Sequence, residues 1–200
     1  MDDRRGDDFV LDPANFTIRI DITSAVKWGY KGAQMFDFSL FLSHSGLYVA
    51  LATVFLLFLV IYNPRLMLQD YPPAIQEIVP SKTDVEKCWS TLLGLPFLLV
   101  LLVFPIYATF AFQEQAGGEA GFLPLWLYAF GIAFAFNLWD WLVLDWLIFC
   151  TITPPMFVIP GSEGHPAYKD YFFHFRGFLV GTVFSAVMGL VAAGIVTIFG

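Results

Sequence analysis

The chain has 200 residues, of which 58% are hydrophobic and only 14% are charged, and its formal net charge is -7 at pH 7. This composition excludes an ordinary soluble domain, in which about 25% of residues are charged. The acidic balance argues against nucleic acid as a partner, because binding nucleic acid needs a basic surface. Two cysteines are too few for a disulfide framework.

The charged residues are segregated along the chain. Four long runs contain no Asp, Glu, Lys or Arg: residues 38–62, 88–112, 120–139 and 177–200. A helix needs roughly 20 apolar residues to cross a bilayer. The sequence therefore predicts an all-α integral membrane protein of the plasma or inner membrane, with the lipid bilayer as its first partner. We expect a four-helix transmembrane domain over residues 38–200, with spans at about 38–62, 84–112, 123–152 and 172–199.

Residues 1–37 form the predicted extramembrane N-terminal tail. The tail begins polar and acidic, which predicts no cleavable signal peptide. Hydrophobic and polar residues alternate over 16–23, and this period of two is typical of a half-buried strand. Trp28 and Tyr30 indicate an interfacial segment just before the first span.

The first loop and the start of the second span carry local signals of order. Asn63 and Pro64 end the first span, because the residue before a proline avoids the helical conformation. Four prolines and scattered hydrophobic residues follow, so we expect an ordered loop that lies against the membrane or a partner. Thr83 and Glu86 then form a T-x-x-E capping box, which predicts that the second helix begins before the membrane.

The third span contains the strongest candidate site. Between residues 120 and 162, Asp140 and Asp145 are the only charged residues, and Asn137 lies just before them. Acidic groups in lipid are costly, so they normally face a protein interior and have a function there. In a regular α-helix Asp140 would lie about 60° to one side of Asn137 and Asp145 about 80° to the other. We therefore expect the three polar groups to form a broad stripe.

The start of the fourth span supplies partners for these acids. We expect Arg176 to form an ion pair with Asp145 on an antiparallel neighbour, with His174 as the alternative partner, because pairing relieves the cost of a buried charge. The candidate residues for binding a ligand or ion are therefore Asn137, Asp140, Asp145, His174 and Arg176.

Histidines give only a weak indication of a metal site. The three in the chain, His44, His165 and His174, are far apart in sequence, and no HExxH motif occurs. They are weak candidate ligands, and the sequence assigns no cofactor.

Small residues recur every four positions along the fourth span, at Gly177, Gly181, Ser185, Gly189 and Ala193. Such a ladder lets another helix backbone approach closely. It predicts tight packing within the bundle, in a homo-oligomer or against a partner membrane subunit.

The distribution of basic residues predicts the orientation. Lys27 and Lys31 precede the first span, whereas five Lys and Arg residues lie in or beside loops one and three: Arg65, Lys82, Lys87, Lys169 and Arg176. Because cytoplasmic loops carry the excess of positive charge, loops one and three should be cytoplasmic and both termini outside.

Three classes of function remain open from the sequence. In the first, the intramembrane acidic site binds or conducts a proton, a cation or a polar group of a lipid or other ligand. In the second, the protein is an accessory or assembly subunit of a larger membrane complex. In the third, Asp and His residues form a membrane-embedded, metal-dependent enzyme.

Overall fold

A computed structural model describes residues 37–200; the predicted strand over 16–23 and the predicted interfacial segment lie outside the described residues. Residues 37–200 contain helices and no β-strand. Four of the helical stretches are long and apolar enough to cross a membrane: Phe38–Tyr62, Asp84–Gln115, Phe122–Ile152 and Tyr171–Phe199. The predicted all-α, four-helix membrane bundle is therefore confirmed.

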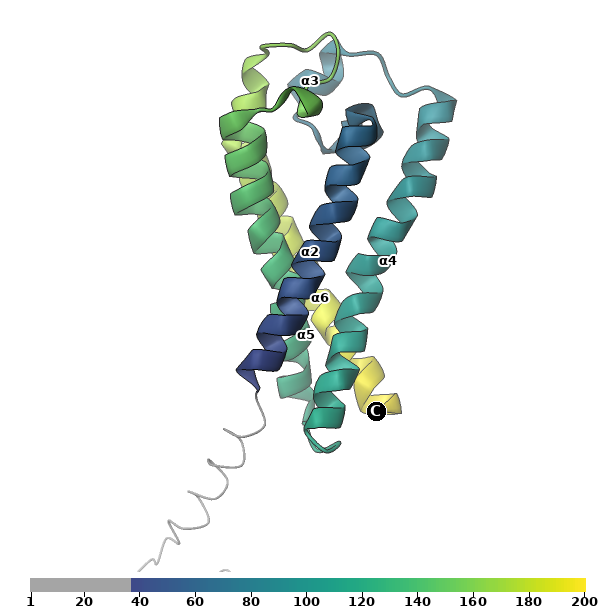
Figure 1. Ribbon diagram of the computed structural model, residues 1–200, viewed down its shortest axis with the longest axis vertical. Coiled ribbons are helices and arrows are strands. Elements are labelled where there is room, and N and C mark those ends of the chain that lie inside the picture. The colour runs from purple at the N-terminus through teal and green to yellow at the C-terminus, as the bar shows by residue number, and fades with distance from the viewer. Residues whose placement is uncertain (1–36) are drawn as a thin grey trace, which may run out of the picture. The chain divides into compact units, whose positions relative to one another are not determined.

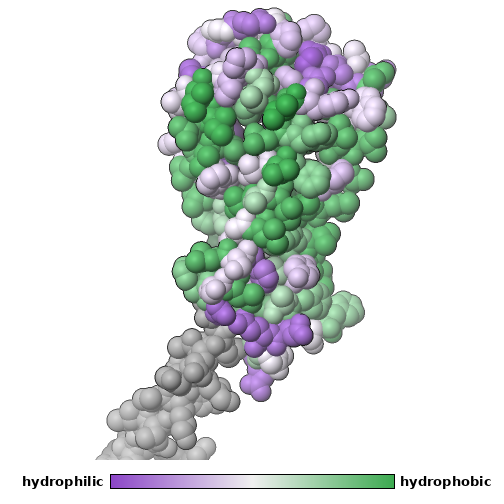
Figure 2. Space-filling view, in the orientation of Figure 1, coloured by the Kyte–Doolittle hydropathy of each residue, from purple (hydrophilic) through white to green (hydrophobic). Residues whose placement is uncertain are grey.

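The spans alternate in direction, so loops one and three meet at the same end of the bundle (Figure 1). α2 (Phe38–Tyr62), α4 (Asp84–Gln115) and α6 (Tyr171–Phe199) are α-helices. The third span is an α-helix, α5 (Phe122–Trp139), that continues as a π-helix, η2 (Asp140–Ile152). Figure 2 shows hydrophobic side chains gathered along the middle of the bundle and hydrophilic ones towards its two ends, as a bilayer requires.

Side chains at the helix ends determine where the spans begin and end. Asp37 caps α2 through its carboxylate, and both hydrogen bonds of the capping box between Thr83 and Glu86 are present. α4 extends beyond its predicted end at residue 112 to Gln115. The prediction stopped too early because polar residues can continue a helix outside the lipid. Gln115 Nε2 donates a hydrogen bond to Asp37 Oδ2 at 2.8 Å, which joins the end of α4 to the start of α2.

Loops one and three fold together into one structure, which we call the cap. It comprises four short helices and their linkers: η1 (Pro64–Asp70), α3 (Pro73–Ile78), η3 (Pro155–Phe157) and η4 (Pro166–Lys169). The first loop is ordered, as expected, and it packs on the third loop. Buried residues from both loops and from the ends of the spans share one core: Val60, Leu68, Tyr71, Ile75, Val79, Phe149, Cys150, Phe157, Ile159 and Tyr168.

Hydrogen bonds fix the cap to itself and to the spans. Tyr71 Oη donates to the carbonyl oxygen of Phe157 at 2.8 Å, and this buried bond links the two loops. Lys169 Nζ donates to the carbonyl oxygens of Cys150 and Thr151. Lysine thereby satisfies carbonyls that would be unpaired at the end of a helix. The cap therefore holds the last turn of η2 in place.

Candidate functional site

A cavity of about 740 Å³ lies among all four spans, next to the cap. Its walls are largely apolar and aromatic, with Phe97, Phe136 and Phe178 among them. The polar side chains that line it come from η1, α5, η2 and α6: Gln69, Asp70, Asn137, Asp140, Asp145, His174 and Arg176. All five residues of the predicted binding set therefore border one cavity.

The two intramembrane acids both lie on the π-helix η2 and border the cavity. A π-helix has hydrogen bonds between residues five apart, and Thr153 N donates to Ile148 O at 2.8 Å at the end of η2. Asp140 and Asp145 are also five residues apart, so the wider turn of the π-helix brings them closer to one side of the helix than α-helical spacing would. Both border the cavity together with Asn137.

Asp145 is paired with His174, across the cavity wall between η2 and α6. Asp145 Oδ1 lies 3.0 Å from His174 Nδ1, and the His174 side chain is only 6% exposed. The rings of Phe149 and Phe173 pack on the imidazole, with centroids 4.9 and 5.2 Å away. His174 Nε2 is buried and has no hydrogen-bond partner among residues 37–200.

The predicted ion pair between Asp145 and Arg176 does not form; the alternative partner, His174, takes its place. Arg176 is exposed, and its guanidinium carbon lies 5.6 Å from the centroid of the Phe172 ring. Within the described residues, no carboxylate comes within the 4.0 Å of Arg176 that defines an ion pair. His174 and Arg176 are two residues apart on α6 and therefore point in different directions.

Asp140 borders the cavity without a hydrogen bond or ion pair to any residue in 37–200. Asn137, three residues earlier in the third span, packs elsewhere. Asn137 Nδ2 donates to Phe178 O and to Thr182 Oγ1, each at 3.1 Å, so its amide joins α5 to α6. Asp140 is therefore a carboxylate at the cavity without a partner among residues 37–200.

Asp70 is a cavity residue that the sequence reasoning did not identify. It ends η1 in the cap and borders the same cavity as Asp140 and Asp145 of η2. Burial raises the pKa of the Asp70 carboxyl, the positive charge of Lys82 opposes the rise, and the negative charge of Asp145 adds to it. In the sequence, the one sign of a buried Asp70 is that it is an acid inside an unusually apolar loop. No local pattern connects that loop to the third span.

The other two histidines lie away from the cavity. His44 Nδ1 lies 2.8 Å from Tyr128 Oη, between α2 and α5. His165 Nδ1 accepts a hydrogen bond from Ala167 N and caps η4. Among residues 37–200, no three His, Cys, Asp or Glu side chains are close enough to share a metal ion.

The ladder of small residues on α6 packs against α5. A Cβ atom on Gly181 would collide with the Asn137 amide, and one on Gly189 would lie 3.1 Å from the backbone nitrogen of Phe130. Ser185 and Ala193 are buried. Gly177, at the start of the ladder, instead borders the cavity.

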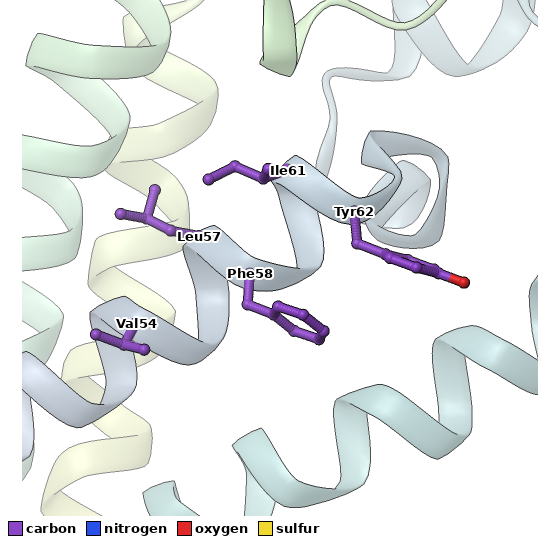
Figure 3. A pocket seen from close by; sticks show the side chains of 5 residues that line it. All are labelled: Val54, Leu57, Phe58, Ile61 and Tyr62. Atoms are coloured by element: carbon purple, nitrogen blue, oxygen red, sulfur yellow. The ribbon is translucent and has the colours of Figure 1, made fainter.

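A second, smaller pocket of about 470 Å³ lies along α2 and differs in character (Figure 3). All of its lining residues belong to α2: Val54, Leu57, Phe58, Ile61 and Tyr62. It offers no charged group. The polar and charged side chains of the predicted binding set border the larger cavity instead.

Comparison with models of known protein families, with curated proteins and with solved structures gives no match to this chain. The geometry of the cavity is thus the basis for a functional conclusion. That geometry combines a large apolar space with acids from two different segments of the chain, and it can hold a ligand that carries positive charge.

Proposed function

We propose that this small membrane protein binds a small organic cation in the cavity, with Asp140 as the principal counter-charge. The observation that carries the proposal is the carboxylate of Asp140, which borders the cavity and lacks a hydrogen bond or ion pair within residues 37–200. An acidic side chain at membrane depth is costly unless something compensates it. A bound ammonium group supplies that compensation.

The balance of charge in the cavity supports a cationic ligand. Three carboxyl groups line it, from Asp70, Asp140 and Asp145, whereas the basic side chains are Arg176 and His174. Asp145 already has His174 as its partner. Asp70 reinforces the negative potential from the cap side, and low-dielectric walls strengthen the attraction for a cation.

The size of the cavity favours an organic molecule over a proton or a bare metal ion. Its volume of about 740 Å³ falls within the roughly 300–1,000 Å³ typical of small-molecule sites. A metal ion needs several ligating side chains at short range, and residues 37–200 bring no suitable group of three together. The aromatic walls suit a ligand with an apolar body, because such surface is removed from water on binding.

The test is a binding titration on purified protein in an uncharged detergent, with phenethylamine as the probe. Phenethylamine carries an ammonium group on an aromatic body. We expect Asp140→Asn to weaken binding about tenfold or more, because a hydrogen bond to a charged group contributes roughly 1.5–3 kcal/mol.

The matched control is Asp84→Asn, which removes the same charge from an exposed position outside the cavity. Its affinity should equal that of the unmodified chain. Equal affinity of the Asp140→Asn and Asp84→Asn variants, or no binding at all, would overturn the proposal. That outcome would shift the interpretation to an accessory subunit, for which the ordered cap supplies a surface outside the membrane.

A further inference from the structure

We infer that the natural ligand is a zwitterion, with its ammonium group at Asp140 and its anionic group at Arg176 and Trp141. This inference rests on the proposed function and names the class of ligand for the same cavity. It starts from a separation of charges: Asp140 and Arg176 line one cavity, and neither has an ion-pair partner among residues 37–200.

Arg176 provides the cationic side of the site. It borders the same cavity as three carboxyl groups, yet no carboxylate in residues 37–200 lies within ion-pair distance of it. The acid that the sequence assigned to it, Asp145, is held by His174. Guanidinium groups recognise carboxylate and phosphate oxygens through paired hydrogen bonds. The unpaired guanidinium at the cavity is therefore suited to an anionic group of a ligand.

Trp141 provides a second, independent indication that the ligand carries an anionic group. Trp141 borders the cavity, and its Nε1 atom is buried without a hydrogen-bond partner among the described residues. An indole N–H can only donate, so it requires an acceptor. Buried donors without partners are rare and call for an explanation. An oxygen atom of a bound anionic group would satisfy this donor, whereas a simple ammonium compound would leave it unpaired.

The indole is held firmly beside the Arg176 segment. Trp141 stacks on Phe178 with ring centroids 4.3 Å apart, and it also packs on Phe175 at 5.4 Å. These two phenylalanines flank Arg176 along α6. Asp140 immediately precedes Trp141 on η2. The carboxylate that accepts from the ammonium group of the ligand and the indole N–H that donates to its anionic group therefore come from adjacent residues.

Three probes with the same aromatic body separate the possibilities: phenylalanine is a zwitterion, phenethylamine a cation and 3-phenylpropionate an anion. We expect the unmodified protein in an uncharged detergent to bind phenylalanine about tenfold more tightly than phenethylamine, because only the zwitterion pairs with both sides of the site. It should bind 3-phenylpropionate weakest, because the acids repel it.

Arg176→Gln should reduce the affinity for phenylalanine to that for phenethylamine, and it should leave the affinity for phenethylamine equal or higher. The matched control is Lys87→Gln, which removes an exposed positive charge outside the cavity. Trp141→Phe keeps the aromatic ring and removes the N–H donor, so it should weaken phenylalanine binding selectively. Thermal stability of each variant, measured on the same sample, separates loss of recognition from loss of fold.

The outcomes distinguish this inference from the proposed function. If phenethylamine binds in an Asp140-dependent way but as tightly as phenylalanine, the zwitterion inference fails and the proposed function stands. If Arg176→Gln weakens both probes equally, the inference also fails. Absence of binding by every probe would overturn both.

A lipid zwitterion is tested in parallel with lysophosphatidylethanolamine, which carries an ammonium and a phosphate group. If Arg176→Gln and Asp140→Asn each weaken its binding and it binds more tightly than phenylalanine, the ligand is a lipid headgroup. The reverse order of affinity identifies a soluble amino acid or a related compound.

Discussion

His174 Nδ1 lies 3.0 Å from Asp145 Oδ1, and this contact joins α6 to the π-helix η2 at the edge of the cavity. Removing the imidazole in His174→Ala leaves Asp145 without its partner and opens a void between Phe149 and Phe173. We expect a loss of about 1–3 kcal/mol of stability, because a partly buried acceptor is left unpaired. Thermal unfolding in detergent measures the loss.

The comparison variant for this contact is Asp145→Asn. It keeps an acceptor oxygen for the His174 N–H, so it should destabilise the protein less than His174→Ala. Equal losses would mean that the charge of Asp145, rather than the hydrogen bond, holds the two helices together.

Asp140→Leu should keep or raise the thermal stability while abolishing binding of a cationic probe. The carboxylate has no partner within residues 37–200, and replacing an uncompensated acid inside a candidate membrane span by an apolar side chain removes a cost. Asp140→Asn should likewise keep the fold. If Asp140→Leu instead melted at a clearly lower temperature, Asp140 would be a structural acid bonded across helices.

Gly181→Leu should destabilise the bundle by roughly 1–3 kcal/mol or more, because a side chain there must displace the Asn137 amide that joins α5 to α6. The matched control is Val187→Leu on the same helix, since Val187 is 50% exposed and faces away from this packing. Thermal stability in detergent reports both variants. Equal melting temperatures would contradict the packing role of the small residues on α6.

The pH dependence of stability should include a contribution from Asp70. Its pKa is raised above the ordinary value of 3.8, mainly by burial, with Lys82 opposing and Asp145 adding to the rise. A raised pKa means that the folded state holds the proton more tightly than the unfolded state. This stabilisation is complete below about pH 3.8 and is lost as the pH rises through the raised value.

Asp70→Asn removes this titration. The melting temperature of the variant relative to the unmodified chain should therefore increase steadily as the pH is raised from 4 towards neutrality. Asp84→Asn, at an exposed position, controls for the general effect of charge. If the melting temperatures of the unmodified chain and the Asp70→Asn variant changed in parallel with pH, Asp70 would make no contribution to the pH dependence of stability.

The predicted orientation can be tested by cysteine labelling of intact cells. Both termini and loop two should face outside, since loops one and three carry the excess of Lys and Arg. Glu119→Cys in a Cys88→Ser background places an exposed thiol in loop two; Gly118 is less suitable, because its φ of +78° would strain a cysteine.

An impermeant maleimide should label the Glu119→Cys variant in intact cells. In the unmodified chain, Cys88 is exposed at the opposite end of the bundle and should react only after the membrane is opened. The reverse pattern would invert the assignment.

The number of spans and most of their bounds followed from the sequence, because the membrane imposes a simple length and polarity requirement on each helix. α2 begins and ends at the predicted residues, and the capping box at Thr83 starts α4 as expected. Such features depend on residues close together in the chain. They could be predicted without knowledge of the fold.

The candidate site was predicted only in part, because its geometry depends on long-range packing. The π-helix brings Asp140 and Asp145 closer to one side of the third span than an α-helix would, and no local pattern distinguishes it from an α-helix. Asp70 reaches the cavity only because loop one folds onto loop three. The choice of His174 over Arg176 as the partner of Asp145 depends on how α6 is rotated against η2.

The shared core of the two long loops has a consequence for proteolysis. A protease requires a segment of chain that can leave the folded structure, and long loops are usually the first to do so. Here the two long loops bury Tyr71, Ile75 and Ile159 in one core, so cutting either requires the cap to open. The short turn at Gly117 and Gly118 is exposed at the other end of the bundle. Of the three loops that connect the spans, a non-specific protease should therefore cut the turn at Gly117 and Gly118 first and leave loops one and three intact.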